Sequence, residues 1–323
     1  MSRRGWALFA AMCVIWGIPY LLIRVAVRDV SPGTLVFMRT AIGGLVLLPL
    51  ALRSGGFGPV LRRWKPLVAF TVLEIAVPWL LLGDAEQHLP SSLTGLLVAA
   101  VPLVGVLAGR LTGTGDHIGS SRWAGLLLGL LGVGVLVGLD LGSVSGLALV
   151  EVGLVTIGYA TAPIIMATQL ADLPRFPVVS AALLLSAVAW AAYGLTHWPR
   201  HVAATGAASI VVLGLVCTAL AFVVFFALIA EIGPNRATVI TYVNPAVAVA
   251  LGLLLLNEQF TAGMGIGFPL ILVGSVLAAS TGRGAANKAA SQAANMAANK
   301  AASPAVEASD ARASGVEADA QPV

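Results

Sequence analysis

Charge is scarce in this chain, and its scarcity excludes most soluble folds. Only 10% of the 323 residues are Asp, Glu, Lys or Arg, whereas 59% are hydrophobic and the mean hydropathy is +0.96. Globular domains carry about 25% charged residues. A water-soluble core is therefore excluded, and long apolar runs take its place.

Cysteine and histidine are also rare, at two and four residues. Cys13 and Cys217 both lie inside apolar runs, where a thiol behaves as a small hydrophobe, so no disulfide is expected. The sequence contains no H-E-x-x-H zinc motif and no G-x-x-x-x-G-K-[ST] phosphate loop. We therefore predict no metal, no cofactor and no enzymatic activity. The four histidines all lie near expected loops: His88, His117, His197 and His201.

Ten apolar stretches dominate the chain. A helix needs about 20 mostly apolar residues to cross about 30 Å of hydrocarbon. The stretches predict an all-α integral membrane protein with ten transmembrane helices. The expected spans are 6–26, 33–52, 65–84, 90–110, 123–139, 145–168, 176–197, 207–229, 236–256 and 263–280.

The spans fall into two similar halves, residues 6–140 and 145–280, which we predict to be five-helix repeats. Because each half has an odd number of spans, the second enters the membrane from the opposite side. Such inverted repeats are found in many secondary transporters. Two glycine intervals recur in both halves: Gly5 to Gly17 with Gly146 to Gly158, and Gly125 to Gly132 with Gly267 to Gly274.

Basic residues recur at alternate span ends rather than in one patch, so the pI of about 9.4 does not indicate nucleic-acid binding. The positive-inside rule predicts a multi-pass protein of the cell (inner) membrane with both termini in the cytoplasm. Asp84, Glu86 and Asp140 are then expected outside. Twelve basic residues face the cytoplasm and three face outside: Arg3, Arg4, Arg53, Arg62, Arg63, Lys65, Arg110, Arg122, Arg175, Arg236, Arg283 and Lys288, against Arg24, Arg28 and Arg200.

Residues 281–323 differ in composition from the rest, being rich in Ala, Asn, Ser, Lys and Glu. The sequence AANKAA occurs there twice, at 285–290 and 297–302. With little apolar surface to bury, ordering this segment would cost more conformational entropy than its contacts return. We predict a disordered cytoplasmic tail. The alternative is a short Ala-rich helix that forms on a partner.

Polar and aromatic residues inside four spans recur at helical spacing and share a face. Because polar groups in hydrocarbon are costly, these faces are expected to line a common central space. The four stripes are Cys13, Trp16, Gly17, Tyr20 and Arg24; Thr71, Glu74 and Pro78 with Trp79; Thr156, Tyr159 and Pro163; and Thr238, Thr241, Tyr242 and Pro245 with Asn244.

Ten residues from these stripes and neighbouring spans are predicted to bind substrate. For the deeper aromatic residues, ordinary helix packing is the alternative, and Thr94 has a structural alternative as well. By contrast, Trp6, Trp64, Trp190 and Trp198 lie near span ends and are expected in the lipid headgroup belt. The predicted substrate-binding residues are Trp16, Tyr20, Glu74, Trp79, Thr94, Tyr159, Thr218, Phe222, Tyr242 and Asn244.

Glu74 is the most informative single residue, because it lies near the middle of its span. A carboxyl group that faces a water-accessible cavity at this depth is a candidate for proton coupling. Two alternatives remain, a structural ion pair with Arg39 and a misplaced span boundary. Glu151 lies closer to the outer edge of its span, where an entry-side or interfacial carboxylate is expected.

Proline and glycine mark four further spans. Pro102 and Pro245 hold matching positions in the fourth and ninth spans and are predicted to be hinges or gates, because proline kinks a helix. The fifth and tenth spans are rich in glycine, which predicts close helix packing. That packing braces each half or pairs two molecules, so the sequence predicts a monomer or a homodimer.

Several motifs together resemble the EamA family of the drug/metabolite transporter superfamily. They are "WG" at Trp16, "SPGTLVFMR" from Ser31 to Arg39, "TALAF" from Thr218, and "NPAVAVALGLLLLNE" from Asn244 to Glu258. The resemblance implies a ten-helix pseudo-symmetric fold, with helices 1–4 and 6–9 around a cavity and helices 5 and 10 behind. The first repeat departs from it, with Gly115 and Asp116 where the second has Glu258.

The expected function is that of a secondary transporter in the lipid bilayer. We predict alternating access for small metabolites, amino acids or drug-like compounds across the plasma membrane, most often outward, since family members mostly export. The alternative is a membrane channel, or a signalling or scaffold protein without carrier activity. Substrate identity does not follow from the resemblance.

Overall fold

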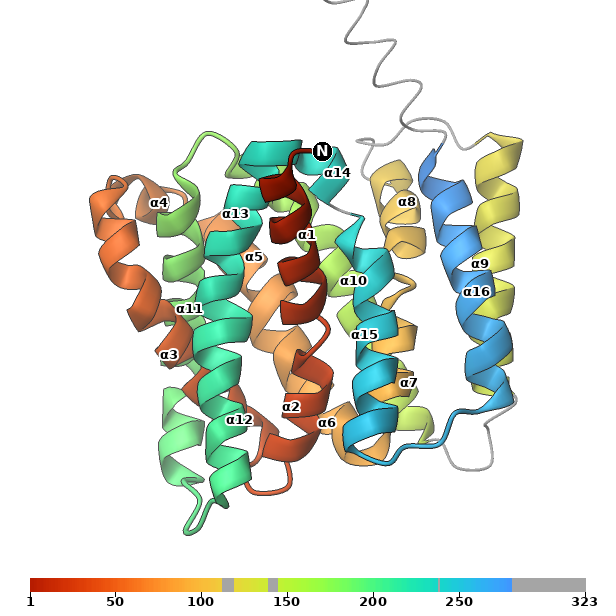
Figure 1. Ribbon diagram of the computed structural model, residues 1–323. Helices are drawn as coiled ribbons and strands as arrows, with labels where there is room; N and C mark the ends of the chain where they lie inside the picture. Colours follow the sequence, from red (N-terminus) through yellow and green to blue (C-terminus); the bar gives the residue numbers. More distant parts are fainter. Residues whose placement is uncertain (112–118, 139–144, 238, 281–323) are drawn as a thin grey trace, which may run out of the picture. The chain divides into compact units, whose positions relative to one another are not determined.

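Helices are the regular structure of the protein in the part that its computed structural model describes, residues 1–111, 119–138, 145–237 and 239–280 (Figure 1). Eight of these helices or helix pairs are long and apolar enough to cross a membrane, and two shorter apolar helices are Ile240–Leu255 and Ala262–Ala278. This architecture is that of an all-α integral membrane protein. Some residues named above lie outside the described residues: Gly115, Asp116, His117, Asp140, Thr238 and the segment 281–323.

The helices follow the expected spans closely. Met1–Ala278 forms one compact unit, so the two predicted halves do not separate into two bodies. In chain order the elements are α1 (Arg3–Ile15), α2 (Pro19–Ala26), α3 (Pro32–Arg53), α4 (Gly58–Arg62), α5 (Trp64–Thr71), η1 (Val72–Ala76), α6 (Val77–His88), α7 (Ser91–Val98), α8 (Val101–Leu111), α9 (Ser120–Gly138), α10 (Gly146–Gln169), α11 (Arg175–Thr196), α12 (Ala204–Gly214), η2 (Leu215–Leu220), α13 (Ala221–Ile232), α14 (Pro234–Ala237), α15 (Ile240–Leu255) and α16 (Ala262–Ser280).

Several spans are interrupted within the membrane, which the apolar pattern did not predict. The first breaks between α1 and α2 at Trp16–Ile18, before Pro19, whose ring nitrogen has no N–H to donate. The third and eighth spans each contain one π-helical segment, η1 and η2. Such π-turns occur frequently at functional sites, because the wider turn frees backbone groups from the regular ladder.

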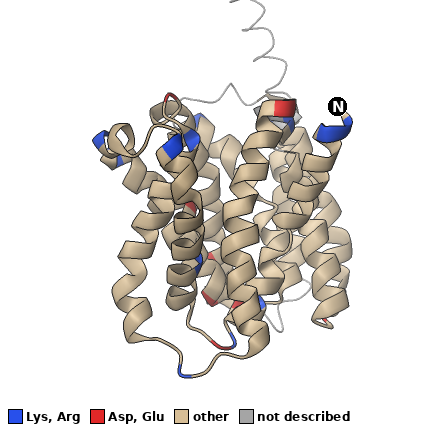
Figure 2. Cartoon of the chain, turned by 60° about the vertical axis from the view of Figure 1, so that its left-hand side comes forward, with Lys and Arg blue, Asp and Glu red and all other residues tan. Residues whose placement is uncertain are grey.

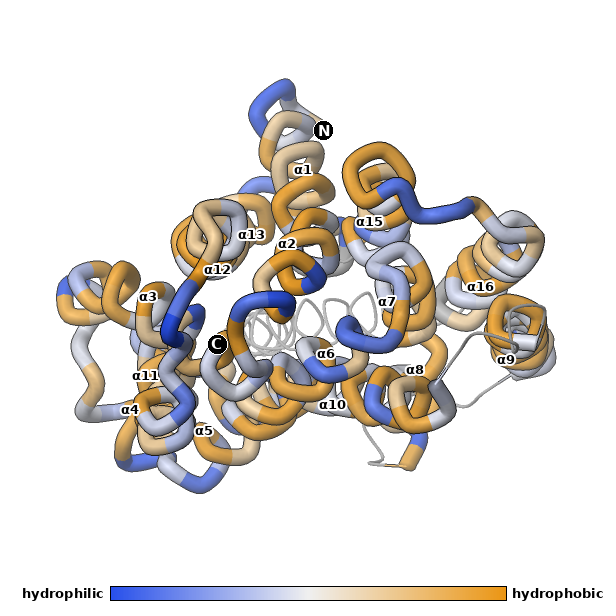
Figure 3. The backbone as a smooth tube through the Cα atoms, turned by 90° about the horizontal axis from the view of Figure 1, so that it is seen from below, coloured by the Kyte–Doolittle hydropathy of each residue, from blue (hydrophilic) through white to orange (hydrophobic). Residues whose placement is uncertain are grey.

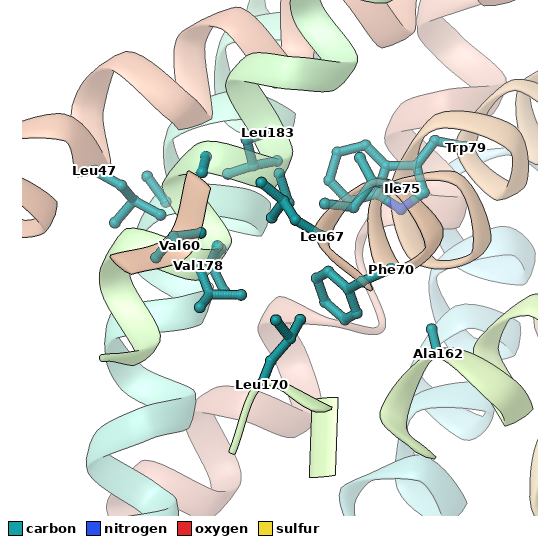
Figure 4. Close-up of a cluster of buried hydrophobic side chains, with 14 of the residues drawn as sticks. Leu47, Val60, Leu67, Phe70, Ile75, Trp79, Ala162, Leu170, Val178 and Leu183 are labelled. Carbon is teal, nitrogen blue, oxygen red and sulfur yellow. The ribbon is translucent and has the colours of Figure 1, made fainter. Parts of the chain in front are cut away.

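The core is shared between the two predicted halves. α3 packs against α11, α7 against α15, α6 against α10, α2 against α12 and α1 against α13. A buried cluster therefore joins side chains from both halves, among them Leu67 and Phe70 with Leu170 and Val178 (Figure 4). Trp79 lies at an edge of this cluster beside Ile75.

Glycines bring α9 and α16 into backbone contact. The small-residue pattern predicted close packing, but within each half or between two molecules rather than between these two helices. A Cβ atom on Gly125 would lie 2.5 Å from the Ala278 nitrogen, and one on Gly274 would lie 2.6 Å from the Gly125 carbonyl oxygen. The two helices lie side by side in Figures 1 and 3. Because α16 belongs to the other predicted half, this contact braces the two halves against each other.

The outer surface matches a lipid environment. Many large apolar side chains are exposed, including Leu45, Leu127 and Leu130. Figure 2 shows Lys and Arg gathered mainly at the end that carries the N-terminus. The expectation for Trp190 was wrong: it is half-buried, and its Nε1 donates to the Ala76 carbonyl at 3.3 Å instead of lying in a headgroup belt.

Gly132→Ala is expected to destabilise the folded protein by roughly 1–3 kcal/mol. The added methyl group would lie 2.7 Å from the Ile271 nitrogen and 2.8 Å from the Gly267 carbonyl oxygen, and backbone atoms cannot move aside without parting the helices. Gly134→Ala is the matched control, because nothing lies within 4 Å of that position. The measurement is the apparent unfolding temperature in detergent. Equal temperatures for both variants would rule out close contact between α9 and α16.

Candidate functional site

Arg39 is a buried cation that side chains of two other spans hold in place. It lies on α3, about two turns from the helix start, and is only 6% exposed. Its guanidinium carbon lies 3.6 Å from the centre of the Trp79 ring of α6, a close cation–π contact. Its Nε donates to Thr218 Oγ1 of η2 at 3.0 Å. The position and plane of the guanidinium are therefore fixed.

The expected alternative partner of Arg39 does not pair with it. Among the described residues no carboxylate lies within 4.0 Å of the Arg39 guanidinium, so the ion pair with Glu74 is not formed. Among the described residues an ion pair joins Arg63 to Asp172 at 2.6 Å, on exposed side chains at the end that carries the N-terminus. Arg39 has no such acidic neighbour.

Glu74 lies in η1, in the middle of the helical span Trp64–His88. The alternative of a misplaced span boundary is therefore wrong. Its Oε2 atom is buried and has no hydrogen-bond partner. On the neighbouring α10, Tyr159 interacts electrostatically with both Glu74 and Arg39. Glu74 is thus a partly buried carboxyl group with an unused acceptor.

Five spans meet at these side chains. Tyr20 of α2 lies near Arg39 and Tyr159 and is included in the same group. Gly158 permits the close approach of α10, since a Cβ atom there would clash with the Leu73 carbonyl oxygen of η1. We call this group the Arg39 cluster: Tyr20, Arg39, Glu74, Trp79, Tyr159 and Thr218.

Trp16 and Phe222 form a separate aromatic group. Their ring centroids lie 6.3 Å apart in an edge-to-face arrangement, and Phe225 lies 4.7 Å from Trp16. These contacts join the end of α1 to α13. The geometry explains helix packing, which was the alternative for these residues, and a role in substrate binding stays a prediction.

Asn244 and Thr94 use their polar groups on the backbone. With its amide nitrogen facing the carbonyls, Asn244 donates to Ile240 O at 3.0 Å and Cys13 O at 3.1 Å. The Cys13 carbonyl needs this donor, because Gly17 N donates to Val14 O at the helix break. Thr94 Oγ1 donates to Pro90 O at 3.1 Å, the structural role that the sequence left open.

The remaining stripe residues are less uniform than expected. Tyr242 is half-buried on α15, whereas Pro163 on α10 is exposed. Pro102 is the second residue of α8, just after the interruption that ends α7, but α15 continues through Pro245. The two prolines therefore differ, because the helix is interrupted before Pro102 but not at Pro245. Their role as hinges or gates stays a prediction.

α6 continues to His88, four residues beyond the expected span end at Asp84. Glu86 therefore lies in a helix and is fully buried. Its position on the outer side of the membrane stays a prediction. Arg24 donates to its carbonyl oxygen, which stabilises the end of this helix. Glu151 is also buried, and its Oε2 atom has no hydrogen-bond partner. Its role as an entry-side or interfacial carboxylate stays a prediction.

Glu258 clamps the N-terminus of α7. Its carboxylate accepts from Ser91 N and Oγ at 2.8 and 3.0 Å, and from Ser92 N and Oγ at 3.0 and 2.5 Å. A carboxylate suits this position because a helix N-terminus presents unpaired N–H groups and a positive dipole end. The clamp joins the fourth span to the loop after the ninth.

Two apolar grooves lie away from the Arg39 cluster. One of about 590 Å³ lies between α8, α9 and α10 and has Thr156 as its hydroxyl-bearing residue. The other, about 350 Å³, lies between α7, α15 and α16. Such linings suit acyl chains rather than polar solutes. A solute cavity at the Arg39 cluster therefore stays a prediction.

Sequence reasoning named Arg39 only as a possible partner of Glu74 and overlooked Ser91 and Ser92. Arg39 stands in an otherwise apolar run, so the cost argument applied to Glu74 would have identified it. The serines carry the helix-start signal of a hydroxyl residue before an apolar run. Their partner Glu258 is 167 residues away from Ser91, so no local sequence pattern connects them.

Comparison with known proteins gives consistent matches. The EamA-like transporter family matches residues 3–138 and, separately, 146–280. YedA of Escherichia coli (strain K12), an uncharacterized inner membrane transporter, is 30% identical over 256 residues, covering 76% of this chain and 80% of YedA. YdfC of Bacillus subtilis (strain 168), an uncharacterized transporter, is 24% identical over 253 residues, covering 76% and 81%. One solved crystal structure has a TM-score of 0.62 at 20% identity, covering 88% of this chain and 99% of the other, which shows a shared fold.

Glu258→Ala is expected to destabilise the protein by roughly 2–3 kcal/mol, because it removes four charge-assisted hydrogen bonds and leaves the first N–H groups of α7 without a protein acceptor. Glu258→Gln should have about half this effect, since the amide keeps one acceptor. Gln259→Ala, on the exposed neighbouring residue, is the control. Thermal unfolding in detergent is the measurement. A Glu258→Ala protein as stable as the control would show that the clamp contributes nothing.

Proposed function

The chain belongs to the EamA-like transporter family, and on this basis we propose that it is a secondary carrier that moves small organic solutes by alternating access. It is a multi-pass membrane transporter. The proposal adds that it works in the cell (inner) membrane, where YedA is named as a transporter, and that it exports its solutes. Both termini would then lie in the cytoplasm. The gathering of Lys and Arg at the end that carries the N-terminus supports this orientation.

The observation that carries the proposal is the pair of buried ionisable groups in the Arg39 cluster. Arg39 has no carboxylate neighbour, and Glu74 has an acceptor without a partner. Within a membrane such groups are costly, and they usually mark a solute or ion pathway. Aromatic side chains from three spans surround them, which gives a solute both polar and apolar contacts.

The helix pairing supports an inverted repeat, which we include in the proposal. If spans 1–5 correspond to spans 6–10, the pairs α3 with α11, α7 with α15 and α9 with α16 each join equivalent spans. The contact of α1 with α13 joins spans 1 and 8. Exchanging the two halves turns these into spans 6 and 3, and the corresponding contact of α10 with α6 is also present. The π-turns η1 and η2 occupy equivalent spans. This pattern is what a two-fold pseudo-symmetric carrier requires.

The Glu258 clamp supplies a candidate for the external closure. With the termini in the cytoplasm, Ser91, Ser92 and Glu258 lie at the outer end of the bundle. The clamp holds the fourth and ninth spans together there. In the proposed cycle these hydrogen bonds break when the carrier opens outward. Rigid-body movement of the helices then exposes the Arg39 cluster to the outer side of the membrane.

Counterflow tests the carrier function directly. A growth screen of overexpressing cells against amino acids and toxic compounds first identifies a candidate solute. Proteoliposomes loaded with that solute are then expected to take up external labelled solute faster than unloaded ones, because a carrier returns faster when it is occupied. Protein-free liposomes are the control. A channel would show flux without this stimulation, and a scaffold would show no flux; either result would reject the proposal.

Glu74→Gln tests proton coupling. Gln has nearly the same shape as Glu but cannot take up and release a proton, so solute exchange should persist while uptake driven by a pH gradient is lost. Folded yield should change little. Glu231→Gln, on an exposed carboxylate near the end of α13, is the control and should keep wild-type coupling. If the Glu74→Gln carrier keeps its pH dependence, Glu74 is not the coupling residue.

A further inference from the structure

We propose that Arg39 binds an anionic group, a carboxylate or a phosphate-type oxyanion, on the transported solute, and thereby selects solutes by charge. The inference rests on the proposed carrier function, and it names the chemical class of the solute. It is carried by the burial of Arg39, by its lack of an acidic neighbour and by the way that its guanidinium is held.

The first argument is the uncompensated charge. Arg39 is 6% exposed, and no carboxylate of the described residues lies within 4.0 Å. The Trp79 ring compensates part of the desolvation cost through its negative face, at 3.6 Å. A buried cation without a counter-charge is otherwise strongly unfavourable. A solute anion would supply the missing negative charge, so its binding would neutralise the buried charge of Arg39.

The second argument is the geometry of the remaining donors. Arginine carries five N–H donors in a planar fork. The Nε donor is used on Thr218, while no hydrogen bond from the two terminal amino groups is present among the described residues. These two groups form the end of the fork, which matches the two oxygens of a carboxylate or phosphate. Thr218 and Trp79 orient the fork before a solute arrives.

Other arginines of the chain show what a structural arginine does instead. Arg63 binds both carboxylate oxygens of Asp172, at 2.6 and 2.7 Å, and also the Gln169 carbonyl. Arg24 donates to the Glu86 carbonyl. The terminal amino groups of Arg63 and Arg24 thus donate to protein oxygens and connect different elements of the fold. Arg39 has its Nε fixed in the same manner, but its terminal amino groups are left for another ligand.

Thr218 is a positioning residue for Arg39. Its hydroxyl donates to the Leu213 carbonyl at 2.8 Å, across the π-turn η2, and so presents its oxygen to Arg39 Nε. A regular α-helix would bond residue 218 to residue 214, so the π-turn creates this arrangement.

The test uses three planar probes of nearly equal shape and different charge: benzoate, benzamide and benzamidine. Phenylphosphonate is added to separate carboxylate from phosphate recognition. Ligands that bind the folded protein raise its unfolding temperature. For the purified full chain in detergent, benzoate or phenylphosphonate is expected to raise the unfolding temperature in a saturable manner, and benzamide and benzamidine are expected to have at least tenfold weaker effects.

The variants assign this selectivity to Arg39. Arg39→Gln should weaken anion binding at least tenfold, Arg39→Lys should retain part of it, and Thr218→Val should weaken it while keeping the preference for anions. Arg200→Gln, on an exposed arginine in the loop before α12, is the control and should bind as the wild type does. A purely structural Arg39 would change stability in these variants without changing the preference for charge.

Several outcomes would overturn the inference. They are equal stabilisation of the wild type by the neutral or cationic probe, anion binding by Arg39→Gln at wild-type strength, or no stabilisation by either anion. If Arg39→Gln fails to fold, the wild-type probe series alone decides. The carrier function is judged separately by counterflow, so a carrier that exchanges its solute but prefers cationic probes would refute only the assignment of Arg39.

Discussion

A polar group inside hydrocarbon needs a partner within the protein, and this constraint accounts for most of the architecture. Where the first span breaks, the freed Cys13 carbonyl accepts from Asn244 of another helix. Where the eighth span widens into a π-turn, Thr218 bonds the Leu213 carbonyl. Where α7 begins, Glu258 accepts from its N–H groups. At these three places a specific side chain bonds the backbone groups at a helix end or break.

The Arg39 cluster departs from this rule, and the departure makes it the candidate site. Arg39 has a stacking partner and one hydrogen bond but no counter-charge, and Glu74 has a buried oxygen without a donor. Glu86 and Glu151 also carry buried carboxylate oxygens without a hydrogen-bond partner. The Arg39 cluster differs from them because it joins such a carboxyl group to a cation that has no carboxylate within 4.0 Å among the described residues. Their natural complement is a solute or a proton, which are the ligands that a carrier takes up and releases.

Several helix pairs join the two halves. α3 of the first half packs along α11 of the second, and α9 meets α16 at glycines that permit backbone contact. Because lipid supplies no hydrophobic force between helices, such close packing and a few interhelical hydrogen bonds hold the bundle together.

The sequence by itself determined the class of protein and the positions of the spans, because hydropathy is a property of local composition. The cost of a charge in lipid also singled out Glu74 as a candidate, whose role stays a prediction. The sequence predicted close packing at the glycines of the fifth and tenth spans, but only the tertiary structure showed that these two spans pack against each other. Only the tertiary structure decided that Arg39 stacks on Trp79 instead of pairing with Glu74, that Asn244 serves the backbone, and that Glu258 caps α7. These contacts join residues far apart in the chain, and their geometry depends on helix breaks and π-turns that leave no periodic signal in the sequence.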